Sequence, residues 1–226
     1  MTVFVLVHAP LVGPATWEGV ARELRTAGHA VVVPRLTSPF VCDSYWCRHV
    51  GEVIASVPSS NMSIVLVAHS GAGPLLPAME NRLGDRVVAR VFVDAMVPCP
   101  LRSRFQAFGA EAVAAVRSSA RNGCWPRWPD AVMARQIPNP AHRARVVGEM
   151  QPLPLAVYQE TLPADTISAH VKCGYLRFSE PYANEAQSAA AQGCRSPRHG
   201  AHGLPPGRFS PPRDQVRRRA PRPSSQ

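Results

Sequence analysis

A serine between small residues is the feature of this sequence that could do chemistry. Residues 63–73 read Ser-Ile-Val-Leu-Val-Ala-His-Ser-Gly-Ala-Gly, an apolar, β-branched run that ends at Ser70 and is followed at once by an apolar helical pattern. A strand, a sharp turn and a helix in this order expose the hydroxyl of a nucleophilic serine, and the turn needs small residues two positions to either side. Ala68 and Ala72 meet that need where glycine is usual. Ser70 is therefore the candidate nucleophile; the alternative is that it only caps the following helix.

The elements around this turn alternate between strands and helices. Apolar residues at helical spacing predict the helices. Short apolar runs predict strands at residues 2–8, 30–34, 63–70 and 87–94. Such alternation implies an α/β fold with a mostly parallel, doubly wound sheet and right-handed crossovers. The carboxyl ends of these strands, where such sheets carry their chemistry, hold His8, Ser70 and Asp94.

Three segments resemble the α/β-hydrolase superfamily: residues 5–17 (Val-Leu-Val-His-Ala-Pro-Leu-Val-Gly-Pro-Ala-Thr-Trp), 67–73 (Val-Ala-His-Ser-Gly-Ala-Gly) and 91–95 (Val-Phe-Val-Asp-Ala). The chain is similar to the group of plant esterases and hydroxynitrile lyases, and closer to small hydrolases of high-GC actinobacteria, over about residues 2–193. The resemblance implies a serine hydrolase, without a cofactor, that attacks a small ester, thioester or amide through Ser70.

The oxyanion hole departs from the family pattern. In the family, the second donor is the backbone N–H two residues after the loop histidine, and that residue here is Pro10, which has no N–H. The N–H of Gly71 remains as the first donor, and Leu11 supplies the second only if the loop shifts. Because loss of one donor costs about 100- to 1000-fold in rate, we expect slow hydrolysis. His8 is expected to be a structural histidine of the loop.

The acid of the triad is expected after a strand at residues 173–179. Glu180 follows that strand, where the family's chain order of serine, acid and histidine places it. A buried carboxylate there would fix the tautomer of the histidine and stabilise its charged form. Asp94 and Asp165 are the competing acids. The structural alternative for Glu180 is a first-turn glutamate that interacts favourably with the helix dipole.

The segment that should carry the histidine of the triad does not follow the family pattern in this sequence. The family has one more buried strand, a Gly-x-His loop and a final helix, whereas residues 194–226 hold 8 Arg, 7 Pro and one acid, typical of a disordered basic tail. His202 and His199 lie near the expected distance but follow no strand, so a chance match is preferred. The break after Gly193 suggests a shifted reading frame in GC-rich DNA. We therefore expect the last strand and helix to be missing and activity to be weak or absent.

Residues 99–165 interrupt the alternation and are expected to form a small helical cap over the serine. Trp125 and Trp128, in Cys-Trp-Pro-Arg-Trp-Pro, are the candidate substrate-binding residues, because aromatic side chains line small-molecule pockets. The alternative, weighed equally, is that they pack the cap onto the body. A non-catalytic ligand-binding homologue, or a lyase on the same scaffold, is the alternative function.

Composition argues against other classes of function. The net charge is +10, but the tail supplies +7 of it, so no specific nucleic-acid binding is indicated. The six cysteines lack paired metal spacing, and no apolar run is long enough to span a membrane. We expect one domain over residues 1–193, a small-molecule substrate and a cytoplasmic protein with reduced thiols. Self-association is expected through the sheet edge left open at residues 173–179.

Overall fold

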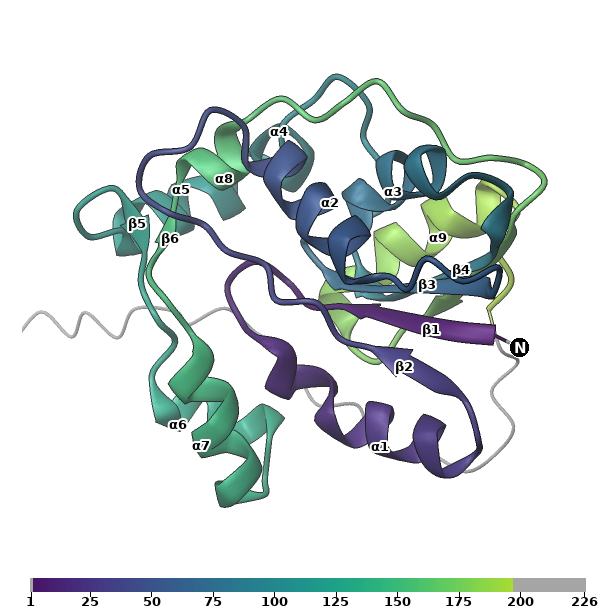
Figure 1. Ribbon diagram of the computed structural model, residues 1–226. Helices are drawn as coiled ribbons and strands as arrows, with labels where there is room; N and C mark the ends of the chain where they lie inside the picture. Colours follow the sequence, from purple (N-terminus) through teal and green to yellow (C-terminus); the bar gives the residue numbers. More distant parts are fainter. Residues whose placement is uncertain (1, 197–226) are drawn as a thin grey trace, which may run out of the picture.

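A five-stranded, wholly parallel sheet forms the centre of the protein, with strand order β2-β1-β3-β4-β7 (Figure 1). The computed structural model describes residues 2–196. The strands are β1 (Thr2–Val7), β2 (Ala30–Val32), β3 (Ser63–Ser70), β4 (Val87–Ala95) and β7 (Lys172–Leu176). The prediction of a mostly parallel α/β sheet is confirmed, because apolar β-branched runs are buried most fully when helices cover both faces.

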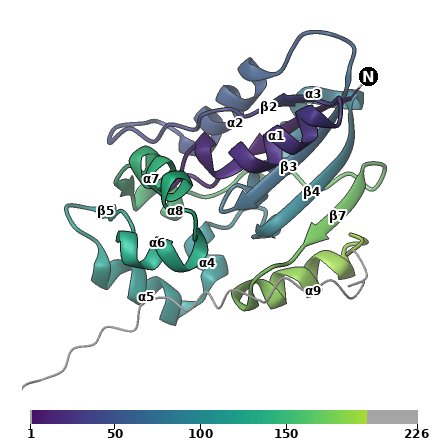
Figure 2. The same cartoon turned by 90° about the horizontal axis from the view of Figure 1, so that it is seen from below.

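Helices lie on both faces of this sheet. They are α1 (Glu18–Thr26), α2 (Tyr45–Ser56), α3 (Leu76–Leu83) and α9 (Ala183–Ala191). Short 3₁₀ turns adjoin them: η1 (Pro14–Trp17), η2 (Gly73–Leu75), η3 (Gly84–Arg86) and η4 (Glu180–Tyr182). Seen from below, α1 lies across one face, and its apolar side packs on that face, while α2, α3 and α9 pack on the other (Figure 2).

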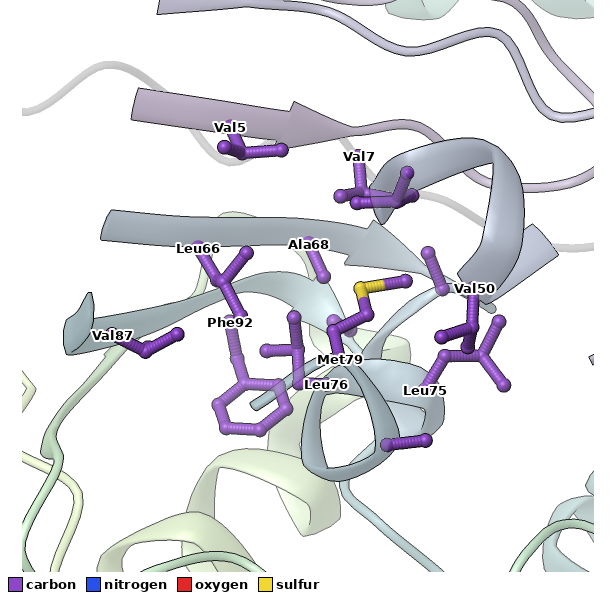
Figure 3. Packing of buried hydrophobic residues seen from close by; sticks show 14 of the residues in the cluster. Val5, Val7, Val50, Leu66, Ala68, Leu75, Leu76, Met79, Val87 and Phe92 are labelled. Carbon is purple, nitrogen blue, oxygen red and sulfur yellow. The ribbon is translucent and has the colours of Figure 1, made fainter. Parts of the chain in front are cut away.

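The larger core lies between the sheet and α2, α3 and α9. Alternate strand residues such as Val5, Leu66 and Phe92 point into it and are at most 1% exposed (Figure 3). Leu76 and Met79 of α3 pack against them and are fully buried. Full burial of one such side chain stabilises the fold by about 1.5–3 kcal/mol. This cluster therefore fixes the strand and helix that flank Ser70.

The segment between β4 and β7 holds its own helices at the end of the sheet toward which the strand arrows point (Figure 1). Its helices are α4 (Arg104–Phe108), α5 (Ala110–Ser119), α6 (Asp130–Gln136), α7 (Pro140–Glu149) and α8 (Ala156–Gln159). A short antiparallel pair joins them, β5 (Cys124–Trp125) with β6 (Leu153–Pro154). We call residues 99–165 the cap segment. Its apolar cluster includes Phe105 and Tyr158 and also Ala9 and Leu11, which follow β1.

The free edge of β7 is partly covered by the chain that follows α9. The N–H of Arg195 donates to the carbonyl of Cys173 at 2.8 Å, and the N–H of Tyr175 donates to the carbonyl of Arg195 at 2.9 Å. Arg195 thereby forms a parallel bridge with Gly174. The expectation of a bare edge at residues 173–179 is thus corrected at its first half, because the returning backbone satisfies those groups.

A disulfide joins Cys173 to Cys194, whose Cα atoms lie 4.4 Å apart. The prediction of reduced thiols is wrong for this pair; the spacing of 21 residues gave no sign that α9 returns the chain to β7. The other four cysteines are free. Most of the Arg/Pro-rich tail, with His199 and His202, lies outside the described residues. Within residues 2–196, no helix combines the length and the apolar character needed to cross a membrane.

Reduction of the disulfide should lower stability. Its loop spans β7 and α9, and a cross-link over 21 residues stabilises by about 3 kcal/mol because it restricts the unfolded chain. We expect dithiothreitol to lower the urea midpoint of the protein. The Cys194→Ser variant should start at the lower midpoint and not respond to reductant. A native midpoint that is unchanged by full reduction would contradict this prediction.

Candidate active site

Ser70 ends β3 in a left-handed turn. Its φ is 53°, a conformation that residues other than glycine rarely adopt. The Ser70 carbonyl accepts the N–H of Met96 at 3.2 Å, which ties the turn to the end of β4. Ala68 and Ala72 are fully buried beside it. A Cβ at position 73 would overlap the Met96 carbonyl oxygen, so Gly73 allows the close approach.

The Ser70 hydroxyl is hydrogen-bonded to the hydroxyl of Tyr182, with 2.7 Å between the oxygens. Tyr182 ends η4, just after β7. Burial raises the pKa of the Tyr182 phenol far above its usual range, although the bond to Ser70 acts in the opposite direction. The phenol is therefore neutral at physiological pH. Sequence reasoning missed this residue, whose only signal was its place two residues after the expected acid.

Asp94 fixes the turn that carries Tyr182. One carboxylate oxygen accepts the N–H of Phe178 at 2.7 Å and the N–H of Ser179 at 3.3 Å. Asp94 is itself in a left-handed conformation, with φ 37°, and is 9% exposed. Its carboxylate therefore connects the end of β4 to the backbone between β7 and η4, and so places Tyr182 over Ser70.

Glu180 does not provide the buried carboxylate that its place in the sequence predicts. Its side chain is 83% exposed and pairs with Arg177 at 3.0 Å. It is the first residue of the 3₁₀ turn whose last residue, Tyr182, bonds Ser70, and this turn leaves the carboxylate in solvent. The prediction of a buried acid at Glu180 is corrected for this reason. Asp165 accepts a hydrogen bond from the Asn81 side chain at an exposed site.

Two histidines at the strand ends are neutral at physiological pH; His8 is fully buried and His69 is partly buried. His8 accepts the N–H of Leu36 on Nε2 at 3.1 Å, as a structural histidine of the loop does. His69 packs edge-on against Trp17, with 6.2 Å between ring centroids. Burial lowers the pKa of His8 and of His69 to about 4. In the described part of the chain, no histidine is hydrogen-bonded to Ser70.

The loop after β1 brings Pro10 next to the turn at residues 70–73, which we call the elbow. A turn is closed there by the N–H of Val12 and the carbonyl of Ala9 (3.1 Å). Leu11 is 4% exposed, and its N–H makes no backbone hydrogen bond within residues 2–196. The point where a Cβ of residue 71 would lie is 3.6 Å from Cδ of Pro10. Gly71 and Pro10 are thus neighbours, and the prolyl nitrogen offers no donor there.

A buried arginine joins the cap segment to the elbow. Arg104 is fully buried; its Nε donates to the carbonyl of Gly71 at 2.8 Å and its Nη1 to the carbonyl of Val157 at 2.9 Å. The guanidinium carbon lies 5.5 Å from the centroid of the Tyr158 ring, within the range of a cation–π interaction. Burial lowers the pKa of Arg104, and the nearby Tyr158 acts in the opposite direction.

The two candidate substrate-binding tryptophans lie in the cap segment. Trp125 meets the Tyr158 ring edge-on at 5.4 Å between centroids. Trp128 is partly buried against the same apolar cluster. Both therefore pack against the apolar cluster that joins the cap segment to Ala9 and Leu11 of the body, as the structural alternative expects. A role in substrate binding stays a prediction for both residues.

A cavity lies beside the loop that follows β1. Its volume is about 370 Å³, and the residues that line it include Pro10, Arg35, Thr37 and Glu149. Arg35 and Glu149 face each other there as an ion pair at 2.9 Å. Among residues 2–196, no three potential metal ligands come together.

No family model matches the chain, but solved structures do. An extracellular α/β-hydrolase from a Paenibacillus species, described as sharing structural and functional homology with tobacco salicylic acid binding protein 2, superposes with a TM-score of 0.68 and 20% identity, over 84% of this chain and 86% of that one. A variant of polyneuridine aldehyde esterase superposes with a TM-score of 0.64 and 20% identity, over 87% and 89%. The chain has the α/β-hydrolase fold.

The sequence relatives of this α/β-hydrolase-fold chain are esterases. Esterase PIR7B from Oryza sativa subsp. japonica is 30% identical over 105 residues, which are 42% of this chain and 39% of that protein. The match thus spans about two-fifths of the length of the relative. The predicted resemblance to the α/β-hydrolase superfamily is confirmed, and the closer kinship with actinobacterial hydrolases stays a prediction.

Removal of the Asp94 carboxylate should destabilise the α/β-hydrolase-fold body. The Asp94→Ala variant leaves two N–H groups without their acceptor, and each such loss costs about 1–3 kcal/mol. Asp94→Asn is the matched control, since it keeps an oxygen acceptor and tolerates a left-handed backbone. We expect urea unfolding to show a loss of about 2–4 kcal/mol for alanine and a smaller loss for asparagine. Equal losses would argue against the acceptor role.

Acidification should also destabilise the protein, through three histidines whose pKa is lowered in the folded state. His8 and His69 remain neutral in the folded state down to about pH 4, and His49 down to about pH 3. Unfolded histidine titrates near pH 6.5, so the unfolded state binds more protons below that value. Stability should therefore fall as the pH is lowered from about 6.5 to about 4, by up to about 1.4 kcal/mol per pH unit for each histidine. Urea unfolding at several pH values should show a smaller slope for His69→Gln; an unchanged slope would contradict this.

Proposed function

We propose that this protein is a serine hydrolase acting on a small ester, thioester or amide through Ser70. The observation that carries the proposal is the left-handed turn that presents Ser70 at the carboxyl end of β3, with the Gly71 N–H directly after it. Ser70 Oγ would attack the acyl carbon and expel the alcohol, thiol or amine, and water would then release the acid from the acyl-enzyme. The esterase descriptions of the sequence relatives support the ester class.

The environment of Ser70 supports a slow reaction. Its described partner is the neutral phenol of Tyr182, which is a weak base at physiological pH. Loss of the histidine base of a serine triad costs about a million-fold in kcat, and the residual catalysis of about 1000- to 10,000-fold over water comes from the oxyanion hole and binding. We therefore expect weak hydrolysis, with its rate set largely by the oxyanion donors.

A non-catalytic ligand-binding protein is the second candidate function. It is favoured by the same bond between Ser70 and the neutral Tyr182 phenol, because no side chain within residues 2–196 that could act as a base is hydrogen-bonded to the serine. A lyase on this scaffold would need such a base as well. Ligand binding that survives Ser70→Ala, together with no covalent labelling of the native chain, would select the binding function.

The compartment is also a proposal. A cytoplasmic protein was expected, but the Cys173–Cys194 disulfide favours an oxidising compartment, since structural disulfides are rare in the cytosol. The Paenibacillus neighbour is described as extracellular. The measurement that decides is thiol counting on protein isolated from its source under alkylating conditions.

Covalent labelling tests the role of Ser70. A fluorophosphonate should add one mass increment to the native chain during long incubation, and peptide mapping should place it on Ser70. The Ser70→Ala variant should not be labelled and should lose hydrolysis of p-nitrophenyl acetate. Ser63→Ala, the same change at the opposite end of β3, should behave as the native chain. Hydrolysis that persists in Ser70→Ala would refute the proposed function.

A further inference from the structure

We propose that the hydroxyl of Tyr158 is the second oxyanion donor of this site, in place of the backbone N–H that Pro10 lacks. The inference rests on the proposed function of Ser70 and names a residue of the cap segment, in α8, as part of the same machinery. The Tyr158 hydroxyl would donate a hydrogen bond to the negatively charged oxygen of the tetrahedral intermediate that an acyl substrate forms.

The position of the hydroxyl is the first observation. A Cβ at residue 71 would overlap the Tyr158 oxygen, and the same point lies 3.6 Å from Cδ of Pro10. The hydroxyl thus lies over Gly71 and beside Pro10. These are the two positions from which the resemblance draws the oxyanion donors.

The glycine at position 71 supports this reading. Gly71 is not among the residues with positive φ, so its backbone does not require glycine. What excludes a side chain there is the Tyr158 hydroxyl. The close contact between the Tyr158 hydroxyl and residue 71 therefore depends on both residues, the tyrosine at 158 and the glycine at 71.

The Tyr158 hydroxyl is also unpaired. Tyr45 donates to the backbone carbonyl of Pro39, Tyr175 donates to that of Ala95, and Tyr182 bonds Ser70. Tyr158 is 4% exposed, yet its hydroxyl makes no hydrogen bond to any residue within 2–196. The oxygen itself keeps some contact with solvent, so the hydroxyl is free to donate a hydrogen bond to a ligand at the elbow.

Arg104 makes this hydroxyl a better donor. Its guanidinium lies over the Tyr158 ring and also holds the carbonyls of Gly71 and Val157, the residue before the tyrosine. A positive charge near the ring stabilises the negative charge that builds up on the phenol oxygen as it donates a hydrogen bond. The hydrogen bond to an anion is therefore stronger. Burial meanwhile raises the pKa of Tyr158, which keeps its proton in place at neutral pH.

The acylation step needs only the substrate and solvent water. Ser70 Oγ forms a bond to the acyl carbon and its proton passes to water, while the carbonyl π pair moves onto the carbonyl oxygen. The Gly71 N–H and the Tyr158 O–H donate to that oxygen and keep their protons. Return of the electron pair then breaks the bond to the leaving group, which takes a proton from solvent.

Tyr158→Phe tests the proposal because it removes one oxygen and keeps the ring contacts with Trp125 and Phe105. We expect the rate of fluorophosphonate modification of Ser70, and kcat for p-nitrophenyl acetate, to fall about 100-fold with KM and the thermal midpoint unchanged. Tyr45→Phe is the matched control, the same change away from the elbow, and should keep the native rates. Pro10→Ala, which restores a backbone N–H, should regain part of the rate lost in Tyr158→Phe.

The outcomes separate this proposal from the one on which it rests. Native modification of Ser70 with an equal rate in Tyr158→Phe would overturn the role of Tyr158 and leave the role of Ser70 intact. A native chain that is not modified at Ser70 at all would overturn both. A rate loss shared equally by Tyr45→Phe would also refute the donor role, since it would reflect a general effect on the fold.

Discussion

The left-handed turn at Ser70 is the constraint on which the rest of the site depends. A backbone of this kind costs about 1–3 kcal/mol and persists only where its surroundings hold it. Here the Met96 N–H holds the Ser70 carbonyl, and Gly73 lets the turn sit directly against β4. The burial of α3 side chains against the sheet stabilises the fold and so offsets the free-energy cost of the turn. The small residues near Ser70 are therefore required for the backbone to fold this way, whatever reaction the serine carries out.

Two separate sets of contacts reach this turn. One starts at Asp94, passes through the backbone after β7 and ends with the Tyr182 hydroxyl on Ser70. The other starts in the cap segment, where Arg104 joins the Gly71 carbonyl to the element that carries Tyr158. The body and the cap segment thus each contribute a tyrosine hydroxyl, and neither tyrosine is charged at physiological pH. The groups closest to the Ser70 turn are thus neutral hydroxyls, and the charged groups, Asp94 and Arg104, act on them through the backbone and the Tyr158 ring.

Local sequence patterns predicted the parallel sheet and the turn, because strand runs and small residues act over a few positions. The site around the turn depends on contacts that such patterns do not contain. Glu180 and Tyr182 are two residues apart, and only the 3₁₀ geometry of η4 decides that the tyrosine faces Ser70 and the carboxylate faces solvent. Tyr158 reaches Gly71 across a long insertion. Cys173 and Cys194 meet because α9 reverses the chain, a tertiary event that spacing alone does not show.

The overlap between position 71 and the Tyr158 hydroxyl has a consequence for how this protein can evolve. The two residues share one volume, so a side chain at position 71 is tolerated only when residue 158 becomes smaller or turns away. Among descendants of this chain, a larger residue at position 71 should occur only together with a change at position 158. A lineage that enlarged residue 71 would lose the tyrosine, and it would need its second donor from the backbone of the loop after β1. The identity of residue 71 would then mark which of the two kinds of oxyanion hole a lineage has.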